Sequence, residues 1–139
     1  MSNATPASSV LYARLVAKAR LRHLQLLVAV ADSGSVRRAA EQIGMSQPAA
    51  TQALADIEGL LAAPLFERHV RGMRLTAEGR AVVPMARNTL SALRASTDTV
   101  HALQAGASGV LRVGAIPAGV SGLLCRVLPS FGARYPALR

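Results

Sequence analysis

The sequence predicts a mainly α-helical protein that carries one short β-hairpin and ends in an incomplete α/β fragment. First, apolar residues recur at steps of three and four through much of the chain, which is the spacing of one face of a helix. Second, 51% of the 139 residues are hydrophobic but only 3% are aromatic, and a core of Ala, Leu and Val favours helices packed on helices. Third, the part after residue 109 contains only one predicted strand, and a single strand cannot form a sheet.

These patterns divide the chain into four segments. We place an N-terminal extension at 1–20, a helical domain with its hairpin at 21–79, a long helix at 77–105 and the α/β fragment at 106–139. Within the extension, residues 10–20 predict a short basic amphipathic helix. That helix could contact phosphate or a partner subunit, or it could be only a solvated lead-in.

The stretch from 36 to 61 predicts two helices joined by a tight turn at Gly44 and Met45. A buried helix over 21–31 precedes it and stops at turn-forming residues, of which Ser35 is placed to cap the next helix. Ser46 takes the N-cap position of the second helix, and Pro48 lies in its first turn, where a missing N–H costs little. Two helices around a Gly-containing turn are the signature of a helix-turn-helix. The apolar residues expected on the inner faces are Ala39, Ala40, Ile43, Ala50, Leu54, Ile57 and Leu61.

The second helix of this pair begins with a polar edge opposite its apolar stripe. Neutral hydrogen-bonding groups at that edge suit a helix that reads base edges in the major groove. Two arginines in the first turn of the preceding helix oppose the helix dipole, which fits either nearby phosphates or an ordinary solvated pair. We therefore predict a DNA-binding module with contacts from Ser46, Gln47, Pro48, Thr51, Gln52, Arg37 and Arg38.

Two short extended runs follow, at 65–68 and 73–76, on either side of a loop that contains Gly72. The predicted hairpin carries Arg68, Arg71 and Arg74, and its place directly behind a helix-turn-helix is typical of the wing of a winged module. Such a loop reaches the DNA backbone or the minor groove, where the negative potential favours Arg. The alternative is a surface hairpin whose arginines meet only water.

A long helix is predicted from 77 to about 104, with Thr76 as its cap and Glu78 in its first turn. Pro84 within it removes one backbone donor and predicts a bend. An apolar seam recurs along it at alternating steps of three and four, a pattern that suits a partner helix. A dimer would let two copies contact two half-sites on DNA. The seam consists of Val83, Ala86, Leu90, Leu93, Thr97 and Val100.

The C-terminal fragment is predicted as a hinge at 105–109, a strand at 110–115, a turn at 117–122 and a helix at 123–135, which Pro129 should kink or end. A strand followed by a helix is the first half of a βαβ unit, with the helix N-terminus facing any ligand. Cys125 stands in an apolar setting, and we expect it to be a buried, inert thiol.

The motifs AAEQIGMSQPAATQALADIE at 39–58 and PLFERHVRGMRLTAEG at 64–79, with RVGAIP at 112–117 and LPSFGARYP at 128–136, resemble the LysR-type transcriptional regulators. The resemblance covers about residues 21–136 and implies a dimeric or tetrameric bacterial regulator. It also implies that the linker helices pair antiparallel and that a two-lobed effector domain, of which only the start is present, senses a small molecule. By the same resemblance, the base-reading positions are Gln47, Pro48, Thr51 and Gln52, with a wing contact at Arg71.

This sequence departs from the family pattern at several positions. Gln52 stands where a basic residue is frequent, so a preference for guanine does not follow there. Gly59 lies inside the recognition helix, and Ala62 replaces a helix-ending Gly. Ala118 lacks the hydroxyl that many members use to hold an effector carboxylate, and Ser121 is the only nearby substitute.

The charge favours a polyanionic partner, with 16 Lys and Arg against 7 Asp and Glu and a net charge of +9. Charge alone would also suit an anionic membrane, but no apolar run approaches the roughly 20 residues that span a bilayer. A secretion signal is absent and the one Cys cannot form an internal disulfide, so we expect a cytoplasmic protein.

Other function classes are less well supported by the sequence. Without a Cys–His pair, a phosphate loop or ligand-spaced His and Cys residues, we expect no enzyme, no cofactor and no metal site. One alternative to the regulator stays open, namely a truncated module that dimerises without regulatory activity of its own.

Overall fold

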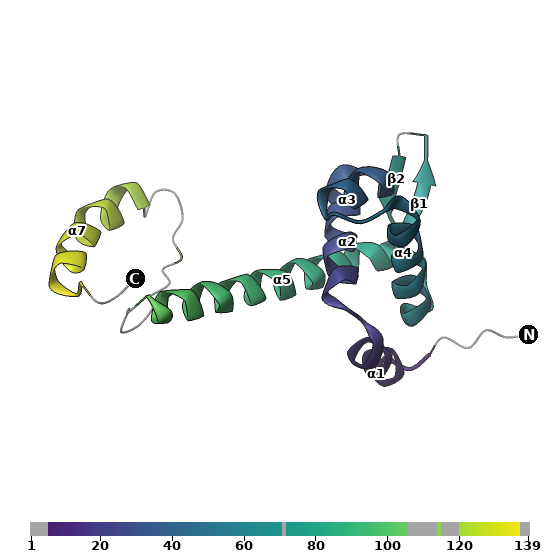
Figure 1. Ribbon diagram of the computed structural model, residues 1–139, viewed down its shortest axis with the longest axis horizontal. Helices are drawn as coiled ribbons and strands as arrows, with labels where there is room; N and C mark the ends of the chain where they lie inside the picture. Colours follow the sequence, from purple (N-terminus) through teal and green to yellow (C-terminus); the bar gives the residue numbers. More distant parts are fainter. Residues whose placement is uncertain (1–5, 71, 106–113, 115–119, 137–139) are drawn as a thin grey trace, which may run out of the picture. The chain divides into compact units, whose positions relative to one another are not determined.

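The computed structural model describes residues 6–70, 72–105, 114 and 120–136 (Figure 1). It is mainly α-helical with one two-stranded antiparallel sheet, as the sequence predicted. The chain divides into two compact units, Met1–Ser91 and Ala92–Arg139, which are described separately below. The elements in chain order are α1 (Ser8–Lys18), α2 (Leu21–Ser33), α3 (Val36–Gln42), α4 (Gln47–Leu61), β1 (Phe66–His69), β2 (Gly72–Leu75), α5 (Ala77–Gln104), the π-helix η1 (Val120–Leu124) and α7 (Cys125–Arg134).

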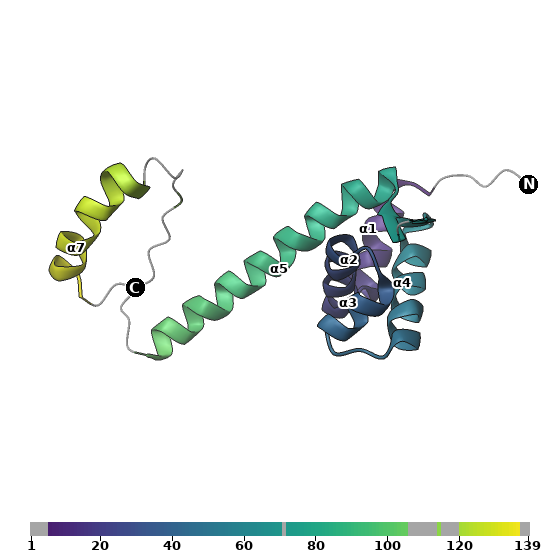
Figure 2. The same ribbon diagram turned by 90° about the horizontal axis from the view of Figure 1, so that it is seen from above.

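The core of the first unit lies between α2, α3 and α4, which are side by side in both views (Figures 1 and 2). Ala39 and Ala40 of α3 are fully covered, and their small side chains let the neighbouring helices approach closely. The apolar stripe predicted for α4 faces inward at Ala50, Leu54 and Ile57. The largest side chains of this core are Leu26, Leu27, Val30, Ile57 and Leu65.

Three helices of this unit end in a left-handed residue. Gly34 ends α2 at φ 63°, and Gly44 follows α3 at φ 64°. After α4 the same conformation falls on Ala62, at φ 53° and ψ 32°, as the departure from the family pattern had suggested. The N–H of Ala63 donates to the carbonyl of Glu58 (3.2 Å), which closes the hydrogen-bond pattern of a Schellman motif. An L-residue in this region costs roughly 1–2 kcal/mol that a glycine would not.

The β-hairpin is fixed to the helices through glycines that allow close backbone approach. The N–H of Met73 donates to the carbonyl of Gly34 (2.8 Å), and a Cβ on Gly72 would lie 2.5 Å from that same oxygen. A Cβ on Gly79 would lie 2.1 Å from the carbonyl oxygen of Leu65. Each strand is one residue closer to the loop than predicted, so that only residues 70–71 separate the two strands.

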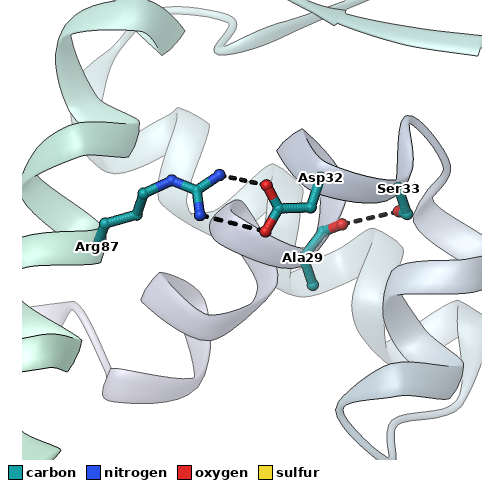
Figure 3. Close-up of polar contacts among 4 residues, drawn as sticks. All are labelled: Ala29, Asp32, Ser33 and Arg87. Carbon is teal, nitrogen blue, oxygen red and sulfur yellow. Dashed lines mark hydrogen bonds and ion pairs between the residues drawn. The ribbon is translucent and has the colours of Figure 1, made fainter. Parts of the chain in front are cut away.

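Helix α5 covers the range predicted for it and runs through Pro84 without interruption. Its start is capped by Thr76, whose Oγ1 accepts the N–H of Gly79 (3.0 Å) and donates to the carbonyl of Pro64 (2.7 Å). Farther along, the Arg87 guanidinium reaches both carboxylate oxygens of Asp32 on α2 (Figure 3). These contacts attach the first half of α5 to its own winged domain.

The prediction that the whole seam of α5 serves a partner helix is wrong for its first two members. Val83 is 4% exposed and Ala86 is fully covered, because this part of α5 packs on the domain core. Leu90 is half-buried, and only the later members, Leu93, Thr97 and Val100, are exposed.

In the second unit, the turn predicted at 117–122 gives way to η1, which begins at Val120, and α7 continues through Pro129. Cys125 is exposed, so the expectation of a buried thiol is wrong. Among the described residues, no side chain of α7 is buried. The predicted strand at 110–115, most of the hinge and Ala118 lie outside the described residues, and Ser121 is placed only by its backbone in η1.

Candidate nucleic-acid interface

The candidate interface is the N-terminal end of α4. The Oγ of Ser46 accepts the N–H of Ala49 (3.4 Å), and Pro48 lies in the first turn, so the helix begins where the sequence predicted. Ser46, Gln47, Pro48, Thr51 and Gln52 are all exposed. The opposite face of the helix supplies the buried residues, so the polar edge is held outward by core packing.

Two of these side chains already make hydrogen bonds within α4. The hydroxyl of Thr51 donates to the carbonyl of Gln47 (3.0 Å), so it can only accept from a ligand or contact it through its methyl group. The amide nitrogen of Gln52 donates to Oδ1 of Asp56 (2.8 Å). For Gln47, the residue at the tip of the helix, no side-chain hydrogen bond is seen in the described structure.

One flank of the polar edge is a hollow of about 280 Å³ between α3, α4 and the hairpin. Its lining brings together Arg37, Gln47 and Arg68, which lie on three different elements. Arg37 also pairs with Glu41 (3.7 Å between Nη1 and Oε1), but both side chains are more than 60% exposed. Such a pair contributes little stability, about 0.3–0.5 kcal/mol, and can exchange readily for a phosphate. Arg38 is exposed on the same helix.

The other flank is a hollow of about 440 Å³ lined by Arg20, Arg22, Gln52 and Asp56, among others. Here Nη2 of Arg22 donates to the carbonyls of Ile43 (3.0 Å) and Gly44 (2.9 Å) at the end of α3. The sequence interpretation missed Arg22, because it treated 21–31 only as a buried helix. The sequence could have indicated its exposure, because a cation directly before the apolar stripe that begins at His23 and Leu24 cannot face the core.

The two described arginines of the hairpin, Arg68 and Arg74, lie on opposite faces. In the strand register, Arg68 pairs with Met73, whereas Arg74 pairs with Glu67. Side chains of adjacent strand positions point to opposite faces, so Arg74 and Glu67 share the face away from Arg68. Arg71, at the predicted tip of the wing, lies outside the described residues.

Glu58 links the far end of α4 to the wing. Its Oε1 accepts the N–H groups of Leu65 (2.7 Å) and Phe66 (3.2 Å), where β1 begins. The same helix therefore carries the polar edge at one end and the anchor of the hairpin at the other. This contact fixes the hairpin relative to α4, and the sequence interpretation did not identify it.

The charged side chains of Arg20, Arg22, Arg37, Asp56 and Arg68, which line the two hollows, are exposed to solvent. Away from the interface, the hydrogen bond and the Coulombic attraction of Asp32 raise the pKa of Arg87 above its ordinary value. The stability that this shift contributes is present below the ordinary pKa of Arg and is lost only in strong alkali.

Among the described residues, no group of three or more His, Cys, Asp or Glu could hold a metal ion, and no helix is long and apolar enough to cross a membrane.

Comparison with known proteins gives consistent matches. The family model described as "Bacterial regulatory helix-turn-helix protein, lysR family" matches residues 21–80. The HTH-type transcriptional regulator GbpR of Azospirillum brasilense is 38% identical over 96% of this chain, which spans 38% of the length of that relative.

Solved structures of DNA complexes also match. A crystal structure of a CbnR_DBD–DNA complex is 35% identical, with a TM-score of 0.56 and coverage of 61% of this chain and 98% of that one. A BenM_DBD/catB site 1 DNA complex is 29% identical, with a TM-score of 0.59 and coverage of 63% and 98%.

Proposed function

This chain belongs to the LysR family of bacterial regulatory helix-turn-helix proteins, and on that premise we propose that it binds double-stranded operator DNA through the N-terminal edge of α4. In this proposal, Gln47, Thr51 and Gln52 read base edges in the major groove. Arg37, Arg38 and Arg68 contact the flanking phosphates, and the wing reaches the adjacent backbone or minor groove through Arg71.

The main support for the proposal is the distribution of neutral and cationic side chains around the first turn of α4. Exposed neutral groups at the tip of α4 lie between two cationic flanks, one with Arg37 and Arg68 and the other with Arg20 and Arg22. Neutral donors and acceptors distinguish bases, whereas Arg side chains neutralise phosphates without reading sequence. The arrangement therefore places groups that distinguish bases at the centre and groups that bind phosphates on both sides, as binding to a duplex requires.

We further propose that the protein acts as a dimer or tetramer in the cytoplasm. The exposed apolar residues on the second half of α5 support this, because Leu93, Val100 and Leu103 are 44%, 52% and 51% exposed. Two copies joined there would contact two half-sites. We also propose control by a small-molecule effector, as the family resemblance implies; the chain spans 29–39% of the length of the curated relatives that it matches.

The test is fluorescence anisotropy of the full chain on double-stranded DNA at several salt concentrations. We expect the logarithm of affinity to fall linearly with the logarithm of salt, and Arg68→Ala should lower that slope by about one unit. Arg74→Ala is the matched control. Arg74 lies on the hairpin face away from Arg68, beside Glu67, so removing Arg74 should change the slope by less.

A different result would favour the alternative function. A chain that dimerises tightly in sedimentation equilibrium but shows no salt-dependent affinity for any duplex would be an interaction module rather than a regulator. Equal slopes for the wild type and both arginine variants would remove Arg68 from the interface.

A further inference from the structure

The hydrogen bond between Gln52 and Asp56 determines which groups Gln52 can present to a ligand. A carboxylate only accepts hydrogen bonds, so the partner of Oδ1 at 2.8 Å must be the amide nitrogen of Gln52. Gln52 is left with one further N–H donor and its carbonyl oxygen, and the residue is exposed to solvent.

Among the four bases, one major-groove edge matches that pair of groups. Adenine presents an acceptor at N7 beside a donor at N6, whereas guanine presents two acceptors, cytosine a donor and thymine an acceptor beside a methyl group. A Gln that has already given one N–H to Asp56 retains what adenine needs. It has lost the second donor that guanine would require.

The surroundings allow a carboxylate to stay at this position. Asp56 lines the same hollow as Arg20 and Arg22, whose positive charges offset its repulsion of DNA phosphates. The i to i+4 spacing of Gln52 and Asp56 keeps the two side chains adjacent on one face of α4. The pair therefore lies on the exposed surface of α4, next to the polar edge of the helix and not inside the core.

We propose that Asp56 is a positioning residue that holds Gln52 in the orientation that recognises adenine. This inference rests on the proposed DNA-binding function and deepens it by naming a base and the residue that enforces it. Asp56 itself touches no base. Asp56 acts through the amide of Gln52, which it orders before DNA binds. Because the amide is already ordered, base recognition costs less conformational entropy.

The experiment begins with selection of duplexes from a pool with randomised positions, using the full wild-type chain. Four duplexes that differ only at the base pair assigned to Gln52 then give a preference ratio by anisotropy. We expect the wild type to prefer adenine, Gln52→Ala to abolish that preference, and Asp56→Ala to lower it about three- to tenfold. Asp56→Asn is the conservative control, because it keeps an acceptor oxygen and should retain most of the preference.

A double-mutant cycle separates this role from a structural one. In the Gln52→Ala background, Asp56→Ala should leave the ratio among the four duplexes unchanged, and the helical circular dichroism of every variant should match the wild type. The inference is overturned if the selected base is not adenine, or if Asp56→Ala changes affinity by the same factor on all four duplexes. In that event salt-dependent binding by the wild type would still support the proposed function, whereas no binding to any duplex would overturn both.

Discussion

The two ends of α4 are built differently. At the first end, Ser46 caps the helix, Pro48 fits the first turn and the side chains face solvent. At the other end, Gly59 lies within the last turns of the helix and Ala62 adopts a left-handed conformation, yet the Glu58 carboxylate accepts two backbone N–H groups at the start of the hairpin. The first end is stabilised by local groups and exposes its side chains for binding. The second end carries local strain, which its tertiary contacts to the wing offset.

Removing the anchor should have the largest effect on stability. Glu58→Ala leaves the N–H groups of Leu65 and Phe66 without their charged acceptor, and we expect a loss of about 2 kcal/mol in the free energy of unfolding. Urea unfolding followed by circular dichroism would measure it. Glu58→Gln keeps an acceptor oxygen and should lose less than half as much; equal losses for the two variants would show that the carboxylate does not act as an acceptor here.

Removing the cap should have a smaller effect at the opposite end. Ser46→Ala deletes the oxygen that accepts the N–H of Ala49, and we expect a loss of about 1 kcal/mol in the free energy of unfolding. Ser46→Thr retains a hydroxyl and serves as the control. A cap that contributes nothing would leave both variants as stable as the wild type.

Relieving the strain should produce a gain of similar or smaller size. Ala62→Gly removes the cost of a left-handed L-residue at φ 53°, and we expect a gain of about 1 kcal/mol after the extra flexibility of glycine in the unfolded chain is subtracted. The matched control is Gly44→Ala, because Gly44 has φ 64° and no atom within 4 Å of an added Cβ. That change should lose about as much as Ala62→Gly gains. If both changes were neutral, the turns would not be strained.

Local features of the fold followed from the sequence, and contacts between distant segments did not. Ser35, Ser46 and Thr76 were predicted as caps and are caps, because a cap bonds to an N–H two or three residues away. Glu58 was missed, since its partners lie seven and eight residues farther along, at the start of a hairpin whose docking no helical pattern encodes.

The seam of α5 shows the same limit. The spacing of its apolar residues was read correctly, but spacing does not say what covers each one. Val83 and Ala86 proved to be buried in their own domain, whereas Val100 stays exposed. Which apolar residues remain free for a partner was decided by where α5 leaves the domain, which is a property of the folded chain.

The most direct test of base reading by α4 is the effect of Gln47→Ala on sequence preference. Gln47 is exposed at the tip of the helix and lines the hollow that also contains Arg37 and Arg68. Affinities of the wild type and the variant should be compared on duplexes that differ at one base pair at a time. We expect the variant to lose discrimination at one position, by roughly 1–3 kcal/mol, and to keep it at all others. Equal weakening on every duplex would contradict base reading and reduce Gln47 to a contact with the DNA backbone.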